Sequence, residues 1–70
     1  MYRLRIDKLR DAARAKGDTS GYAIAQRTGL SEPSISKLLR GKTRPGVETL
    51  LTFRRVYGGT VDELIEEVAA

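Results

Sequence analysis

The apolar positions between residues 6 and 17 recur with the period of a helix. Aliphatic side chains stand three, six and seven residues after the first, at Ile6, Leu9, Ala12 and Ala13, on a stretch that is otherwise rich in lysine and arginine. Gly17 follows them, and glycine is common just past a helix C-terminus. The pattern predicts an amphipathic helix that Gly17 ends.

The five residues before this helix have a different period. Tyr2 and Leu4 alternate with Arg3 and Arg5, which is typical of an extended strand with one apolar face. Residues 1–5 are expected either to lead into the helix or to form a short strand added to a partner. The sequence alone leaves this choice open.

Two short helices are predicted in the middle of the chain, each with a serine in the capping position before it. Ser20 precedes the first helix, which ends at Gly29, where a positive φ lets the chain turn sharply. Its expected inward residues are Tyr22, Ile24 and Ala25. Ser31 precedes the second helix, which is expected to run to about Arg40 and to end at Gly41.

The second of these helices is predicted to have one apolar and one polar side. Pro33 is tolerated near its start because first-turn amides have no partner within the helix. The expected inward residues are Ile35, Leu38 and Leu39. The residues left on the outward side or its edge are Glu32, Ser34, Lys37 and Arg40.

The last third of the chain predicts two more helices. Apolar residues mark a fourth helix from Val47 to Tyr57, and a pair of glycines ends it. Thr60 followed by Glu63 is a capping box that begins a fifth helix. The expected apolar side of the fifth helix consists of Leu64, Ile65 and Val68. The prediction is an all-α fold of five short helices in a single domain, residues 1–70.

The composition excludes several classes of site. The chain of 70 residues has no cysteine and no histidine, which removes thiol nucleophiles, disulfides, zinc-finger ligand sets and imidazole acid–base chemistry. No apolar run approaches the ~18–20 residues of a membrane span. We therefore expect a cytoplasmic protein that is not an enzyme, binds no metal or cofactor, contacts no membrane and has no evident small-molecule ligand.

The Gly-Lys-Thr at residues 41–43 invites comparison with phosphate-cradling nucleotide loops. Such a loop needs a glycine five residues before Gly41, and this chain has Ser36 there, within a predicted helix. We therefore predict no nucleotide site. Lys42 and Arg44 are expected to contact phosphates of a nucleic acid, the alternative being an ordinary solvated loop.

Charge is unevenly distributed along the chain. Residues 1–58 hold all 13 lysines and arginines with five acids, a net +8, whereas residues 59–70 hold four acids, a net −4. A basic body suits a polyanionic partner. The acidic end is expected to face away from a nucleic acid.

The two middle helices have the spacing of a DNA-binding helix-turn-helix. A steep crossing through a short turn needs a small residue at Ala25, a glycine at Gly29 and aliphatic residues beneath, at Leu30, Ile35 and Leu38. The stretch YAIAQRTGLSEPSISKLLRGKTRP, with VETLLTFRRVYGGTVDELI after it, resembles the lambda-repressor/Cro-like (XRE-like) helix-turn-helix family over nearly the whole chain. The residues at the family's motif positions are Ala25, Gly29, Ser31, Ile35, Ser36, Gly41 and Pro45.

The resemblance implies that the predicted helix between Ser31 and Gly41, the third along the chain, lies in the major groove of double-stranded DNA. Its base-facing positions are occupied by Glu32, Pro33, Ser34 and Lys37, and its phosphate-holding positions by Ser31, Arg40, Lys42 and Thr43. The chemistry of the side chains supports part of this. Lys37 can donate to guanine, Ser34 can bond several base edges, and Glu32 can accept from cytosine N4. Pro33 offers only shape or contact with a thymine methyl group.

Three positions carry a second interpretation. Gly21 stands where the family often has a glutamine, so a phosphate contact there falls to a backbone N–H at the helix N-terminus. Leu39 stands where a polar residue is common, and either core packing or a partner explains it. Glu32 either reads a base or favours the helix N-terminus by its charge.

Two functions of different class follow. The first is a sequence-specific transcriptional regulator, a repressor that binds an inverted repeat as a homodimer, since a monomer this small seldom binds one site tightly. The candidates for its dimer surface are Tyr57, Leu64, Ile65 and Val68. The alternative is an antirepressor-like or antitoxin-like protein-interaction module that does not read DNA. Glu32, Pro33 and Leu39 motivate it, because they offer few donors to DNA.

Overall fold

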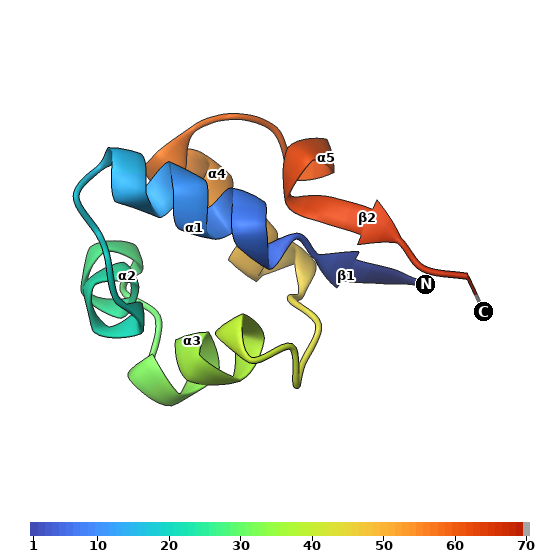
Figure 1. The fold of residues 1–70 in the computed structure, drawn as a ribbon, viewed down its shortest axis with the longest axis horizontal. Helices are drawn as coiled ribbons and strands as arrows, with labels where there is room; N and C mark the ends of the chain where they lie inside the picture. Colours follow the sequence, from blue (N-terminus) through green and yellow to red (C-terminus); the bar gives the residue numbers. More distant parts are fainter. Residues whose placement is uncertain (70) are drawn as a thin grey trace.

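The computed structural model describes residues 1–69 and contains the five predicted helices in the predicted order (Figure 1). Their bounds are α1 Ile6–Ala15, α2 Gly21–Thr28, α3 Glu32–Leu39, α4 Val47–Tyr57 and α5 Val61–Leu64. The all-α prediction is confirmed. Two strands, β1 Tyr2–Leu4 and β2 Ile65–Glu67, add a small antiparallel sheet at one end of the molecule. The first residues therefore form a strand, and its partner is a later segment of the same chain.

The fifth helix is shorter than predicted. It begins with the expected capping box, in which Thr60 Oγ1 accepts from the Glu63 N–H at 3.3 Å and the Glu63 carboxylate accepts from the Thr60 N–H at 3.1 Å. The helix ends at Leu64, and Ile65 is extended, with φ −128° and ψ 157°. The prediction that Ile65 and Val68 continue the helix was wrong. Their spacing suits either structure, and the open hydrogen-bonding edge of β1 favours the strand.

The helices form two groups around one core. α1, α4 and α5 pack together, while α2 and α3 pair with each other, and α2 also contacts α4. In Figure 1, α2 is seen nearly end-on and α3 lies across the view, so these two helices cross steeply. The buried apolar residues are Leu4, Leu9, Ala13, Ile24, Ala25, Ile35, Leu38, Leu50, Phe53 and Leu64. This single core fixes α3 relative to the rest of the molecule.

One predicted core residue lies on the surface. Ile24 and Ala25 of α2 are buried as predicted, but Tyr22 is 58% exposed. Tyr22 precedes Ile24 by two residues and so stands roughly 200° around the helix from it. The inward direction of α2 is set by Ile24 and Ala25, and Tyr22 therefore points away from the core.

A buried carboxylate ties the loop between α1 and α2 to two helices. Arg27 Nε of α2 donates to Asp18 Oδ2, and the Tyr57 hydroxyl of α4 donates to the same atom at 2.8 Å. The hydrogen bond from Arg27 lowers the pKa of Asp18 below its ordinary value. Desolvation, with the nearby Asp18 carboxylate, raises the pKa of Tyr57 well above its ordinary value. The cluster holds α2 against α4 and was not predicted.

Candidate nucleic-acid interface

The N-terminus of α3 is built from residues of the candidate site itself. Ser31 Oγ accepts from the Ser34 N–H at 3.3 Å, and the Ser31 hydroxyl donates to Ser34 Oγ at 2.7 Å. Pro33 stands in the first turn, where a missing N–H costs no helical hydrogen bond. The Glu32 carboxylate also lies in this turn, near the positive end of the helix dipole. A phosphate contact from Ser31 therefore requires its hydroxyl to turn away from Ser34.

The candidates for base reading share the exposed side of α3. Ile35 and Leu38 are buried, with 0% and 6% exposure, and they orient the helix. The exposed residues are Glu32, Pro33, Ser34 and Lys37. Within residues 1–69, neither Glu32 nor Lys37 belongs to an ion pair. This side of α3 thus presents an ammonium, a hydroxyl and a carboxylate that can each bond a base edge.

A groove of about 290 Å³ runs beside this side of α3. Its polar lining comes from α3, the following loop and α4, and includes Ser34, Lys37, Thr43, Arg44 and Thr49. Gly46 caps α4 without a side-chain hydrogen bond, so the first-turn amides of α4 lack a capping acceptor. Thr49 and the start of α4 were not predicted as site residues, because a threonine in the first turn of a helix carries no signal of its own.

The loop after α3 has a fixed backbone geometry. Gly41 has a φ of +72°, and its N–H donates to Leu38 O at 3.1 Å while the Lys42 N–H donates to Lys37 O at 2.9 Å. These two bonds form a Schellman motif, which needs a left-handed residue at the glycine. The side chains of Lys42 and Thr43 are exposed beyond it. Both predicted phosphate contacts therefore project from a defined turn.

The side chains of the two arginines of this region, Arg40 and Arg44, each make a contact within the protein. The Arg44 guanidinium lies 5.9 Å from the centre of the Tyr2 ring, within the range of a cation–π contact. The Tyr2 hydroxyl in turn donates to the carbonyl oxygen of Pro45. Arg40 is exposed, and its Nε reaches back to Ser36 O at 3.4 Å. The strand β1 thus braces the loop that carries Arg44.

Gly21, the first residue of α2, lies close to α3. A Cβ atom at this position would stand 3.3 Å from Leu39 Cδ1 and 3.7 Å from Ile35 Cγ2. Leu39 is half-buried and packs over Gly21. The glycine in place of the expected glutamine and the leucine in place of the expected polar residue therefore have one packing reason, since Gly21 makes room for Leu39. The backbone N–H of Gly21 remains a candidate for a phosphate contact.

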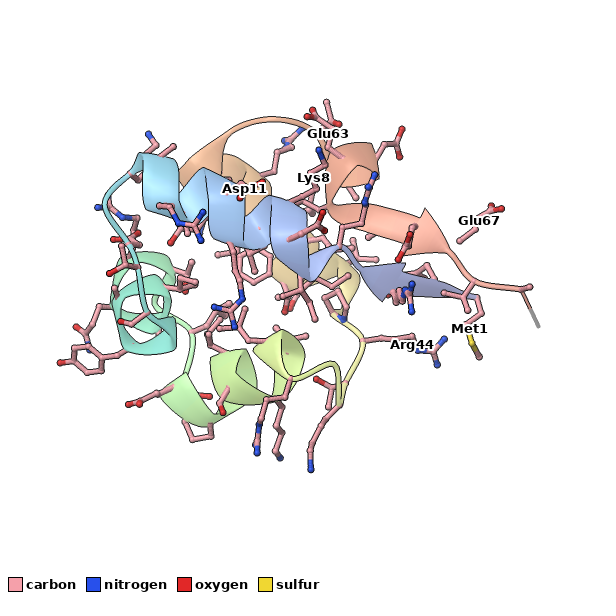
Figure 2. All side chains as sticks on the ribbon, viewed as in Figure 1. Met1, Lys8, Asp11, Arg44, Glu63 and Glu67 are labelled. Atoms are coloured by element: carbon pink, nitrogen blue, oxygen red, sulfur yellow. The ribbon has the colours of Figure 1, made fainter. Side chains whose placement is uncertain are left out.

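Two carboxylates of the acidic end, Glu63 and Glu67, lie apart from α3. In Figure 2, Glu63 on α5 projects outward at the top of the molecule, whereas α3 forms its lower edge, and Glu67 lies on β2. Lys8 and Asp11, on α1, also lie on the side away from α3. The polar side of α3 is therefore separated from the carboxylates of Glu63 and Glu67.

The structure narrows the set of dimer candidates. Leu64 is 6% exposed and belongs to the core, so its side chain cannot form a dimer surface, and this prediction was wrong. Tyr57 is half-buried and bonded to Asp18. Ile65 and Val68 are half-buried beside β1. Besides Tyr22, the exposed apolar residues that sequence reasoning did not identify as surface include Val47 and Leu51 of α4, which are 69% and 44% exposed.

Two kinds of feature are absent from the described part of the chain. None of the helices in residues 1–69 has the length and apolarity needed to cross a membrane. In the same range, His, Cys, Asp and Glu side chains nowhere gather in groups of three or more that could hold a metal ion.

The chain is similar to known helix-turn-helix proteins. The helix-turn-helix family profile matches residues 11–64, most of the chain and both α2 and α3. A relative, the HTH-type transcriptional regulator DdrOP3 of Deinococcus deserti, is 44% identical over 45 residues. This alignment covers 64% of the present chain and 35% of the relative, so the chain spans about a third of the relative's length. No solved structure matches the chain.

Proposed function

Since the chain belongs to the lambda-repressor/Cro-like (XRE-like) helix-turn-helix family, we propose that it is a DNA-binding transcriptional regulator whose α3 reads the major groove. The observation that carries the proposal is the exposed side of α3. It presents Ser34 and Lys37 beside a groove, with a capped helix start at one end and a rigid loop at the other.

Binding would divide into a positioning part and a reading part. Lys42 and Thr43 on the loop after α3, with Ser31 at the start of α3 and the Gly21 N–H at the start of α2, would hold phosphates. Arg40 and Arg44 add positive charge to the loop side. Phosphate contacts supply affinity that falls with salt but carry no sequence information.

Base discrimination would come from the exposed side of α3. Lys37 is suited to guanine, Ser34 to several base edges and Glu32 to cytosine N4, while Pro33 can touch a thymine methyl group. A good bidentate contact to a base edge, such as one from Lys37 to guanine O6 and N7, discriminates by about 1–3 kcal/mol. Glu32 also repels nearby phosphates, so its presence at the tip of α3 favours sites where a cytosine offsets this cost.

The protein would act as a homodimer on an inverted repeat and repress by occupying its site. Support for a pair comes from the small size of the reading surface, since three or four side chains on one α3 specify only a short sequence. The exposed or partly exposed apolar residues available for a dimer surface include Tyr57, Ile65, Val68, Val47 and Leu51.

The experiment that tests the proposal is selection of the purified protein on a random duplex library at near-physiological salt, followed by sequencing of the bound pool. An enriched inverted repeat with half-site centres about one helical turn (~10 bp) apart supports the whole proposal. A single enriched half-site supports DNA reading and contradicts the two-fold dimer. Absence of enrichment contradicts sequence-specific regulation.

A protein-interaction module remains the second candidate. Its support is the exposed pair Glu32 and Pro33, which offers no donors to DNA. Leu39 no longer favours it, because this side chain packs over Gly21. If the library selects nothing while the tagged protein recovers a stoichiometric protein partner through Glu32 and Pro33, this candidate replaces the first.

A further inference from the structure

A second groove, of about 440 Å³, lies on the other side of the loop that follows α3. One wall comes from the N-terminal segment and includes Arg3 and Arg5. The other wall is the loop itself, with Lys42, Thr43 and Arg44. Thr43 and Arg44 also line the groove beside α3, so the two grooves adjoin at the loop. We call the second one the strand groove.

The strand groove is positively charged. Four basic residues and two acids line it, and one acid, Glu66, forms an ion pair with Arg3. Within residues 1–69, Arg5, Lys42 and Arg44 belong to no ion pair. Asp7, the other acid, also has no ion-pair partner in this range and offsets one of these three charges. A net positive groove of this kind attracts a polyanion.

Both walls are held in place by contacts between distant parts of the chain. The Arg5 N–H donates to Leu64 O at 2.7 Å, which fixes the end of β1 against α5. On the loop side, the Tyr2 hydroxyl donates to Pro45 O, and Ile6 Cδ1 stands 4.0 Å from the position of a Cβ on Gly41. The basic side chains therefore project from a frame that exists before any ligand arrives, which lowers the entropy cost of binding.

We propose that the strand groove holds backbone phosphates of the same DNA duplex, outside the segment that α3 reads, and that Arg5 is a DNA-contacting residue. This inference rests on the proposed function. A DNA strand held at the loop by Thr43 and Arg44, which line both grooves, would continue into the strand groove, whose walls carry Lys42 and Arg5. The sheet made by the two ends of the chain thereby extends the footprint beyond the C-terminal end of α3.

The test compares two single-charge variants. Arg5→Gln removes the charge from the strand groove, and Arg5 caps α1 without a side-chain hydrogen bond, so no cap is lost. Lys8→Gln is the matched control, since Lys8 stands three residues later, belongs to no ion pair within residues 1–69 and lies on the side away from α3 (Figure 2). Arg5→Lys keeps the charge. Circular dichroism confirms that each variant is folded.

Affinity for the selected site and for an unrelated duplex is measured by fluorescence anisotropy at a series of salt concentrations. Arg5→Gln is expected to weaken both complexes by the same factor and to reduce the slope of log K against log salt by about 0.9 per chain. Arg5→Lys should keep the wild-type slope, and Lys8→Gln should resemble wild type.

A second readout locates the contact. Duplexes that carry the selected site are shortened stepwise at their ends, and wild-type affinity is expected to fall to the Arg5→Gln level once the phosphates at the strand groove are removed. If the wild type binds its site but Arg5→Gln matches Lys8→Gln in salt slope and length dependence, the inference is wrong and the proposed function stands. If the wild type binds no duplex, both are overturned.

Discussion

The backbone conformation of Gly41 offers the sharpest test of how the loop after α3 is built. Gly41 has a φ of +72°, and a Cβ there would find only Ile6 Cδ1, at an ordinary contact distance of 4.0 Å. An alanine would therefore not clash, and its cost is conformational. A left-handed backbone costs an L-residue about 1–2 kcal/mol, whereas a chain of this size has a total stability of roughly 3.5–10 kcal/mol, at 0.05–0.15 kcal/mol per residue.

Gly41→Ala is therefore expected to lower the free energy of unfolding by about 1–2 kcal/mol. The matched control is Gly46→Ala, at the other end of the same loop. Gly46 has a φ of −77°, and a Cβ added to it would meet nothing within 4 Å. Alanine is less favourable than glycine at an N-cap, which lowers stability, but it also reduces the entropy of the unfolded chain, which raises stability. The two effects oppose each other, so the net change in the free energy of unfolding should stay within about 0.5 kcal/mol.

Urea unfolding followed by circular dichroism measures both variants. With an m value of about 1 kcal/mol/M, the midpoint for Gly41→Ala should fall by ~1–2 M, and the midpoint for Gly46→Ala should stay near wild type. Gly41→Asn should lie between wild type and Gly41→Ala, because asparagine tolerates the left-handed region better. Equal losses for the two alanine variants, or no loss for Gly41→Ala, would refute the reasoning.

Four further outcomes are expected. Lys37→Ala should relax base preference at one position of the selected site, and Lys42→Ala should weaken all duplexes about equally and reduce the salt slope; identical salt slopes for wild type and Lys42→Ala would contradict the phosphate role. Tyr57→Phe should lower the free energy of unfolding, measured by thermal unfolding, by about 1 kcal/mol, because the hydrogen bond to the Asp18 carboxylate is lost. The hydrogen bond from Arg27 lowers the pKa of folded Asp18 below 3.8, so Asp18 stabilises the fold above that pH and the stabilisation is lost as the pH falls through the folded pKa. Stability measured from pH 6 to pH 2 should therefore fall less steeply for Asp18→Asn than for wild type.

Local signals were sufficient for most helix boundaries. The Ser20 and Ser31 caps and the Thr60–Glu63 capping box depend on residues three positions apart. The glycine at the end of α2 likewise acts within one turn, and Gly29 has the expected left-handed backbone. Such short-range chemistry is readable along the chain, and it defined α3 and the turn before it.

Features that join distant segments were not readable in this way. The end of α5 at Leu64 depends on β1, at the opposite end of the chain, because a strand needs a partner before its pattern differs from that of a helix. The cluster of Asp18, Arg27 and Tyr57 joins three segments by hydrogen bonds that no local pattern announces. Tyr22 was assigned to the core because an eight-residue helix has too few apolar residues to define its inward direction.

The sequence by itself determined the five helices, the capped and polar α3, and the glycine turn and loop on either side of it, since each arises from interactions within a few residues. Only the tertiary structure decided that Leu39 packs over Gly21, that Leu64 belongs to the core, and that the two ends of the chain form a sheet. The sheet in turn places Arg5 across a groove from the loop after α3. These features arise where elements far apart in the sequence meet, and their positions are set by how the whole core packs.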